Sequence, residues 1–226
     1  MPKSISVAID GPAGAGKSTI AKRLAKELGF YYVDTGAIYR TVAYFMDLLG
    51  VSPKDADGVQ RYIDELTIDI YYDENGLQHR LMNGMDVTDD IRTPDISQKA
   101  SLVSAHAVVR EMLLDMQRDV AKENNVIMDG RDIGTVVLPK ADVKIFLTAS
   151  PEARAQRRTL ELVEKGQQAD FDSILRDIIA RDEQDANRPI APLKQAEDAV
   201  LVDTTCLDLE QSLEALKSAA KEAVSL

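Results

Sequence analysis

The segment from Gly11 to Thr19 has residue types and spacing that could hold a nucleoside triphosphate. It follows the pattern G-x-x-x-x-G-K-S, in which glycines let successive backbone N–H groups turn inward around an anion. Lys17 would reach the outer phosphates, Ser18 could ligate Mg²⁺, and the following helix adds its positive dipole end. A glycine-rich turn that only joins a strand to a helix would not need Lys17 and Ser18 there. The residues predicted to bind ATP or GTP are Gly11, Pro12, Ala13, Gly14, Ala15, Gly16, Lys17, Ser18 and Thr19.

Two acidic residues come directly after apolar runs that read as strands. Asp129 follows Val126–Met128 and resembles a Walker B position, where it would hold Mg²⁺ through water. The alternative is that Asp129 only caps the turn after its strand. Beside a phosphate-binding loop, we favour the metal role. Asp34 could bind a substrate hydroxyl or pin the next helix, and for it we favour the structural role.

Arginines near these strand ends could bind phosphate. Arg131 and Asp132 lie side by side on the loop that follows Asp129, where a mutual surface ion pair would contribute little. At the carboxyl end of a strand near the phosphate-binding loop, an Arg131 aimed at a phosphate is the better interpretation. Arg40, one turn into the helix after Asp34, is interpreted in the same way, against the alternative of a solvated helix charge.

A second group of arginines lies further along the chain. Arg154, Arg157 and Arg158 share one helix face by their spacing, either paired with neighbouring acids or placed on a lid that closes over transferring phosphates. We favour the lid. Arg181, Asp185 and Arg188 are spaced by four and three residues, so their side chains can converge on one ligand.

These groups predict the type of reaction. His79 and His106 build no convincing Ser-His-Asp arrangement, and neither has metal-ligand spacing. A hydroxyl acceptor would want a positioned base, whereas a phosphate acceptor is already an anionic nucleophile. Transfer to a phosphate requires in-line positioning, Mg²⁺, and cations that absorb the charge of both phosphate groups. Arginines on several loops around a phosphate-binding loop match that requirement.

The elements that must position these residues alternate along the chain. Apolar strands without polar alternation, separated by helices, predict a parallel sheet covered on both faces, in an α/β, doubly wound fold. The expected strands are Ser4–Ile9, Phe30–Val33, Val126–Met128, Val143–Leu147 and Val200–Val202. The expected helices are Lys17–Leu28, Ile38–Leu49, Val108–Lys122, Pro151–Lys165, Phe171–Ala186 and Leu209–Val224.

One segment breaks this alternation. Thr67–Tyr72 and Leu77–Met82 flank a turn-forming run, and Asn83-Gly84 supplies another tight turn, which is hairpin chemistry. We therefore expect residues 51–93 to form a small α+β insert, and residues 1–50 and 94–226 to form the core. Within the core, residues 151–170 are the expected helical lid.

Length and composition limit the class of protein. The 226 residues suffice for one α/β domain with a small insert, and no apolar run approaches the ~20 residues that span a bilayer. A single cysteine, Cys206, allows no internal disulfide and fits a reducing compartment. The net charge of −11 argues against nucleic acid and anionic membranes as partners. We expect a cytoplasmic protein whose positive charge is concentrated where it binds phosphate; 7 of its 14 arginines lie between Arg131 and Arg188.

Together, the motifs resemble those of a known family. Thr35-Gly36-x-x-x-Arg40 resembles the monophosphate-binding segment of nucleoside monophosphate kinases. The full set narrows this to the bacterial cytidylate kinases, and the resemblance covers the chain nearly end to end. That set is Gly11-Pro12-x-Gly14-x-Gly16-Lys17, Asp34-Thr35-Gly36-Ala37-Ile38-Tyr39-Arg40, Asp129-Gly130-Arg131-Asp132-Ile133-Gly134-Thr135-Val136-Val137 and Asn187-Arg188-x-x-Ala191-Pro192-Leu193. The resemblance implies a five-stranded P-loop kinase fold whose insert binds the nucleoside monophosphate.

The resemblance also implies roles for single residues. Arg40, Arg131 and Arg181 would bind the monophosphate, with Thr35 offering a hydroxyl. Arg188 and Asp185 would engage the ribose side. Ser101, Arg110 and Asp132 would read the base: a carboxylate accepts from the cytosine N4 amino group, and a guanidinium donates to N3 or O2. Uracil would set its O4 acceptor against the carboxylate and be rejected.

The implied reaction is transfer of the ATP γ-phosphate to CMP and dCMP, assisted by Mg²⁺. The catalytic residues would be Lys17, Arg131, Arg154, Arg157 and Arg158. The nearest rival is a kinase of UMP, AMP or a small hydroxylated metabolite. A regulatory GTPase should carry an Asn-Lys-x-Asp motif, and no Asn here is followed by Lys. We expect a monomer whose insert and lid close on the substrates.

Overall fold

The computed structural model describes residues 4–74 and 78–224, and these divide into two compact units. The first unit is Met1–Tyr32 with Ala121–Leu226, and the second is Val33–Val120. The second unit contains the whole of the expected insert of residues 51–93, together with the helices on either side of it. The assignment of residues 51–93 as a monophosphate-binding insert stays a prediction.

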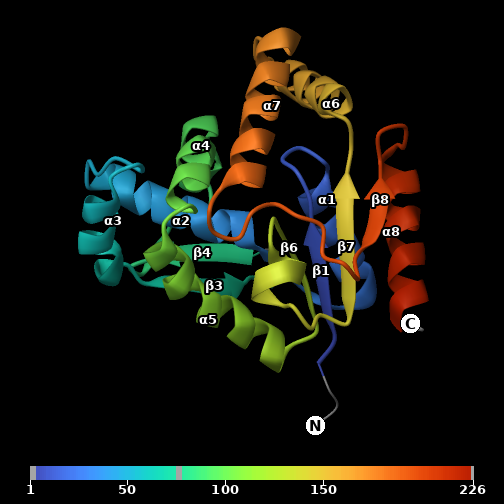
Figure 1. Cartoon of the computed structure of the whole chain (residues 1–226), viewed down its shortest axis with the longest axis horizontal. Helices are drawn as coiled ribbons and strands as arrows, with labels where there is room; N and C mark the ends of the chain where they lie inside the picture. Colours follow the sequence, from blue (N-terminus) through green and yellow to red (C-terminus); the bar gives the residue numbers. More distant parts are fainter. Residues whose placement is uncertain (1–3, 75–77, 225–226) are drawn as a thin grey trace. The chain divides into compact units, whose positions relative to one another are not determined.

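A five-stranded sheet forms the core of the fold (Figure 1). Its order is β2-β6-β1-β7-β8, and β1 runs parallel to both β6 and β7, as β7 does to β8. The predicted doubly wound α/β class with a five-stranded parallel sheet is confirmed. The strands are β1 (Ser6–Asp10), β2 (Tyr31–Asp34), β6 (Val126–Gly130), β7 (Val143–Thr148) and β8 (Val200–Asp203).

Two helices of the first unit pack together against this sheet. Leu24 of α1 (Lys17–Leu28) and Leu216 of α8 (Leu209–Val224) are buried in one cluster with Val7 and Ile145 of the strands. Each buried leucine contributes roughly 2 kcal/mol relative to an exposed one. This packing fixes α1, and with it the loop that joins β1 to α1.

Two more helices follow β7, as Figure 1 shows. Ser150 caps α6 (Pro151–Glu164) by accepting a hydrogen bond from the Ala153 N–H, and Asp170 caps α7 (Phe171–Asn187) in the same way. The two helices pack against each other. They are the helices expected to carry the lid.

A short π-helical turn, η3 (Ile133–Val137), follows β6. In it the Leu138 N–H donates to the Ile133 carbonyl, five residues back, at 2.7 Å. This turn was not predicted from the sequence, and it is the kind of helical irregularity often found at functional sites.

The second unit is mainly helical. Its longer helices are α2 (Thr35–Leu48), α4 (Pro94–Val103) and α5 (Ala107–Glu123, of which the last residues belong to the first unit). Shorter ones are α3 (Ala56–Tyr62), η1 (Ile63–Glu65) and η2 (Asp90–Arg92). The helix α4 was not among those expected, and it packs closely against α2. No helix among the described residues is long and apolar enough to cross a membrane.

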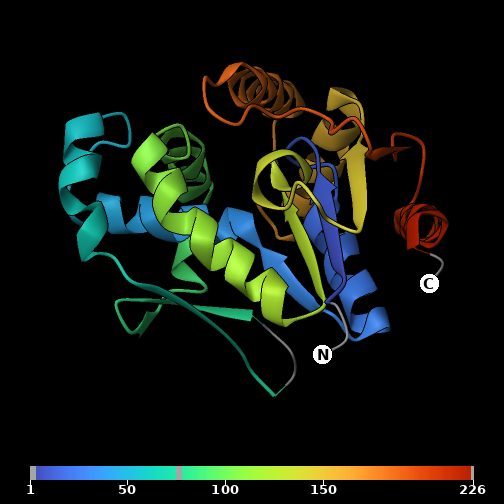
Figure 2. The same cartoon turned by 60° about the horizontal axis from the view of Figure 1, so that its bottom comes forward.

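The expected hairpin is present in the second unit (Figure 2). The strands β3 (Ile68–Tyr72) and β4 (Gln78–Met82) pair antiparallel, and β5 (Met85–Asp86) extends the sheet. Asn83 and Gly84 both have positive φ, 49° and 82°, as a two-residue hairpin turn requires. Residues 75–77, where the other turn was expected, lie outside the described residues. Along β4 the side chains of Arg80 and Met82 are buried.

Candidate active site

The loop from Gly11 to Gly16 leaves the carboxyl end of β1 and enters α1. Gly11, Gly14 and Gly16 have φ values of 147°, 73° and 89°, so glycines occupy the positions where the backbone turns in the left-handed sense. A Cβ at Gly11 would lie 1.9 Å from the Leu147 carbonyl oxygen of β7. The close approach of loop and sheet is therefore possible only for glycine.

Lys17 lies buried over this loop. Its Nζ donates to the carbonyl oxygens of Gly11 and Pro12, both at 2.7 Å. Burial, followed by the positive charge of Arg131, lowers the pKa of the Lys17 amine well below its usual range. Lys17 and Arg131 therefore interact electrostatically, although they are far apart in the sequence.

Asp129 is a buried carboxylate at the end of β6 with two hydroxyl donors. The Ser18 hydroxyl donates to its Oδ2 at 2.9 Å and the Tyr32 hydroxyl donates to its Oδ1 at 2.8 Å. A serine oxygen and a carboxylate side by side are hard oxygen ligands of the kind Mg²⁺ takes, with water and phosphate oxygens completing the shell. These residues therefore fit a magnesium ion. Tyr32 was not predicted from the sequence.

Asp10, at the end of β1, holds the loop after β6. Its Oδ1 accepts from the Ile133 N–H and its Oδ2 from the Gly134 N–H, both at 2.7 Å. Burial raises the pKa of Asp10 from 3.8 to about 6, against the lowering effect of these two bonds. Asp10 thus ties η3, and the Arg131-Asp132 pair before it, to the base of the phosphate-binding loop. Its place directly after an apolar strand, the signal that identified Asp129, could have found it.

Two ion pairs connect that loop with α7. Arg131 Nε donates to Asp185 Oδ2 at 2.8 Å, and Arg188 Nη2 donates to Asp132 Oδ1 at 3.1 Å. Burial opposes ionisation of Asp185, but the charges of Arg131, Arg181 and Arg188 outweigh it and lower the pKa of its carboxyl. The structure therefore brings together Arg131, Asp132, Arg181, Asp185 and Arg188. The spacing in the sequence predicted this convergence only for Arg181, Asp185 and Arg188.

The three arginines of α6 have separate partners. Arg154 is buried, and its guanidinium donates to the Ala13 carbonyl of the phosphate-binding loop at 3.0 Å and to both carboxylate oxygens of Asp182. Arg157 donates to the Thr204 carbonyl, and Arg158 pairs with Glu161 on the exposed face of the helix. Arg154 thus joins α6, α7 and the phosphate-binding loop.

The remaining candidates lie in the second unit, around the start of α2. Asp34 caps α2 by accepting from the Ala37 N–H at 2.8 Å, the structural role favoured from the sequence, and its other oxygen accepts from Arg40 Nη2 at 3.1 Å. Thr35, buried, is the first residue of the helix. Ser101, on α4, is buried as well.

Arg110 begins the second turn of α5 and is also buried. Its guanidinium lies 5.6 Å from the centre of the Tyr39 ring, and its Nη1 donates to the Ser104 carbonyl at 3.2 Å. A cation over an aromatic ring and a bond to a carbonyl both limit how the guanidinium can turn. Arg110 is therefore held in one orientation within the second unit.

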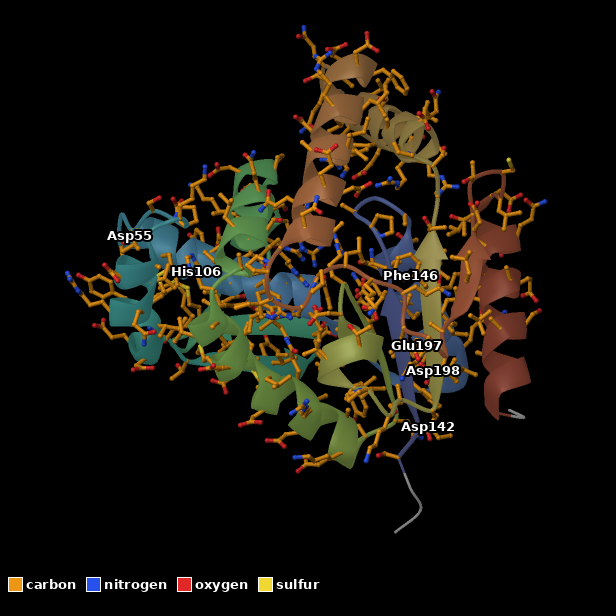
Figure 3. All side chains as sticks on the ribbon, in the orientation of Figure 1. Asp55, His106, Asp142, Phe146, Glu197 and Asp198 are labelled. Atoms are coloured by element: carbon orange, nitrogen blue, oxygen red, sulfur yellow. The ribbon has the colours of Figure 1, made fainter. Side chains whose placement is uncertain are left out.

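The two histidines have structural contacts. His106 Nε2 lies 2.8 Å from the carbonyl oxygen of Pro53, which comes two residues before the Asp55 that caps α3; Figure 3 labels His106 and Asp55. His79 stacks on Tyr71 and contacts Asp86. Within residues 4–74 and 78–224, no three His, Cys, Asp or Glu side chains are grouped to hold a metal ion. A metal at Ser18 and Asp129 would need oxygen ligands from its substrate and from water.

Comparisons with known proteins agree along nearly the whole chain. The family model described as cytidylate kinase matches residues 7–222. The cytidylate kinase of Shouchella clausii is 46% identical over 222 residues, covering 98% of each chain. That of Carboxydothermus hydrogenoformans is 50% identical over 205 residues, covering 91% of this chain and 92% of the relative. Among solved structures, a shikimate kinase from Bacteroides thetaiotaomicron aligns over 98% of this chain and 99% of its own with 17% identity and a TM-score of 0.46.

Proposed function

This chain belongs to the cytidylate kinase family, and we propose that the residues described above carry out that family's reaction. The chain is a phosphotransferase that uses ATP to phosphorylate CMP and dCMP, giving the diphosphates and ADP. The roles of its individual residues are the part that we propose.

One observation carries the assignment of roles. The strands β1 and β6 pair in parallel with Asp10 opposite Gly130, so the loop before Lys17 and the loop that carries Arg131 leave the same edge of the sheet, and Asp185 holds the Arg131 guanidinium in place. A cation suited to a triphosphate and a cation suited to a second phosphate are thus neighbours in the first unit. Two adjacent cations repel each other, and the anionic phosphate groups of a bound donor and a bound acceptor would relieve that repulsion. Phosphoryl transfer to a phosphate acceptor has that charge arrangement.

On the donor side, the segment from Gly11 to Thr19 binds the ATP phosphates, with Lys17 reaching the β- and γ-phosphates. Mg²⁺ would be held by Ser18 and, through water, by Asp129, and would supply charge neutralisation and alignment of the phosphates. The hydrogen bond from Ser18 to Asp129 supports this role because it places the two oxygens side by side, 2.9 Å apart.

On the acceptor side, Arg131, Arg181 and Arg40 bind the monophosphate and Thr35 adds a hydroxyl. A guanidinium can donate two parallel hydrogen bonds to phosphate oxygens, which fixes the attacking oxygen in line. No general base is needed because the attacking oxygen is already anionic. Arg188 and Asp185 engage the ribose.

Ser101, Arg110 and Asp132 read the base. Asp132 accepts from the N4 amino group of cytosine and Arg110 donates to N3 or O2. The observed orientation of Arg110 over Tyr39 supports this role, because a fixed donor discriminates better than a mobile one.

The remaining roles are proposed more coarsely. Arg157 and Arg158 serve on a lid formed by residues 151–170, and Arg154 contributes from its base. We also propose that the enzyme acts as a cytoplasmic monomer and takes neither nucleic acid nor membrane as a partner.

The test is an ADP-release assay with CMP, dCMP, UMP and AMP as acceptors. We expect CMP and dCMP to be the preferred acceptors, and Lys17→Ala to lower kcat by about 10²-fold or more with the fold intact. Lys26→Ala, on the exposed last turn of the same helix, is the matched control. A Lys17→Ala enzyme with near-normal turnover would refute the assigned role, and equal turnover of UMP would refute the assigned base recognition.

A further inference from the structure

The backbone of Asp34 is held from both sides by β4. Gln78 Oε1 accepts from the Asp34 N–H at 3.2 Å, and Arg80 Nη2 donates to the Asp34 carbonyl oxygen at 3.2 Å. Arg80 also donates to Gln78 Oε1, so the two side chains form one unit. All three residues lie in the second unit, where Asp34 is 44 positions from Gln78 and 46 positions from Arg80 in the sequence.

Asp34 in turn determines the start of α2. One carboxylate oxygen caps the helix through the Ala37 N–H, and the other accepts from Arg40 at 3.1 Å. A Cβ at Gly36 would lie 3.2 Å from Asp34 Oδ1 and 3.3 Å from Arg40 Nη1, so the turn is closely packed around this carboxylate. A small rotation of Asp34 would therefore move the cap and the Arg40 guanidinium together.

Arg80 is an unusual residue for its position. Only 3% of it is exposed, on the buried face of a small antiparallel sheet where an apolar side chain would normally lie. Burying a guanidinium is costly, and replacing a buried charge by a packed apolar side chain often leaves stability unchanged or improves it. Stability alone therefore does not explain Arg80, whereas its bond to Asp34 points to a role in the segment that Asp34 organises.

The electrostatics agree with this. Arg40 contacts the Asp34 carboxylate and Arg80 contacts the Asp34 carbonyl oxygen, so two guanidinium groups lie at the start of α2. The helix N-terminus adds further positive potential. The two guanidinium groups and the helix N-terminus would both favour an anionic group bound by Arg40.

We propose that Gln78 and Arg80 are positioning residues for monophosphate binding: they hold the Asp34 backbone so that its carboxylate orients Arg40. The antiparallel sheet of the second unit thereby acts on the acceptor nucleotide without touching it. This inference rests on the proposed function in one respect, namely that Arg40 binds the monophosphate.

The test compares Michaelis constants for the two substrates. Arg80→Met, similar in size but without the donors, should raise the KM for CMP about tenfold and leave the KM for ATP within about twofold. Arg80→Lys, which keeps the charge and the N–H donors of a single nitrogen, should restore much of the loss. His79→Gln is the matched control: it lies next to Arg80, contacts Asp86 instead of Asp34, and should leave both constants unchanged.

A double variant separates this inference from the proposed function. If Arg80 acts through Arg40, then adding Arg80→Met to Arg40→Met should raise the KM for CMP hardly further than Arg40→Met alone. An unchanged KM in Arg40→Met would instead refute the role of Arg40. A raised KM in Arg40→Met with a normal KM in Arg80→Met would overturn the present inference.

A second position guards against loss of folding. Gln78 is only partly buried, and Gln78→Leu removes the acceptor for the Asp34 N–H without removing a buried charge. It should raise the KM for CMP selectively, by several-fold. A lowered thermal midpoint with both constants normal in Gln78→Leu and Arg80→Met would show that the contacts serve stability only, and the inference would be wrong.

Discussion

Replacing Gly11 by alanine tests the close approach of the phosphate-binding loop to the sheet. Gly11 has a φ of 147°, and its new Cβ would lie 1.9 Å from the Leu147 carbonyl oxygen and 3.0 Å from the Leu147 carbonyl carbon. Both obstructing atoms are backbone, so no side chain can turn away. The loop must move off β7, or β7 must shift.

The expected magnitude has two parts. An L-residue held at such a φ costs about 1–3 kcal/mol. The overlap with β7 adds strain that only backbone movement relieves, so the total loss of unfolding free energy should reach about 4 kcal/mol, a value reached only by severe perturbations. Gly29→Ala is the matched control: it has a φ of 67° but nothing within 4 Å of its Cβ, and it should cost only about 1 kcal/mol.

Urea unfolding of both variants and of the parent measures the two losses. In a parallel ADP-release assay, Gly11→Ala should raise the KM for ATP by at least about tenfold, because displaced N–H groups no longer converge on the phosphates. Gly29→Ala should leave it unchanged. Equal losses of stability in the two variants, with a normal KM for ATP in Gly11→Ala, would refute the assigned geometry of the loop.

Three further predictions follow from the site. Since the pKa of Asp10 is raised to about 6, the stability this residue contributes is full below pH 3.8 and is lost as the pH rises through 6. In urea unfolding, the unfolding free energy of the parent relative to that of Asp10→Asn should therefore be about 1 kcal/mol higher at pH 5 than at pH 8. A difference between the two proteins that does not change with pH would contradict the burial argument. Arg131→Lys keeps the charge but loses the bond from Nε to Asp185, so kcat should fall about 10²-fold, while Arg176→Lys on the exposed side of α7 should be neutral. Asp132→Asn should reduce the preference for CMP over UMP in kcat/KM by about tenfold; an unchanged ratio would place base recognition elsewhere.

Much of the fold could be predicted because it depends on local periodicity. The predicted bounds of α1 and α8 match the structure, and the five strands of the parallel sheet were found from apolar runs alone. The helix α4 was missed although its signals were present: Thr93 caps it, Pro94 opens it, and Ile96, Ala100 and Val103 fall on one buried face. The π-helical turn η3 had no such signal, because Asp10, 123 positions away in the sequence, supplies its anchoring bonds.

The candidate site likewise contains residues that could be predicted from the sequence and residues that could not. Motif residues such as Lys17, Arg131 and Arg188 could be named because their types and spacing are themselves informative. Tyr32 and Arg80 could not, because each acts through one hydrogen bond to a residue brought near it by folding: Tyr32 to Asp129, and Arg80 to Asp34. Tyrosine is common in strands, and the burial that makes Arg80 unusual is visible only in the folded chain, so the sequence alone could not single out either residue.

The arginines of the first unit also indicate how a strongly acidic chain can bind two anionic nucleotides. Arg131, Arg188 and Arg154 each pair with a carboxylate, and in each pair one partner belongs to α7 or directly follows it. A guanidinium can donate two parallel hydrogen bonds to a phosphate only when it is correctly oriented. The paired carboxylates fix the orientation of each guanidinium in the folded chain, so substrate binding does not have to supply the free energy of orienting it. The contacts of Arg154 also bear on the proposed lid. Because this buried side chain bonds to the Ala13 carbonyl and to Asp182, a closing motion of residues 151–170 that keeps those bonds would have to pivot beyond Arg154, and Arg158, four residues further along α6, would be on the moving side of the pivot.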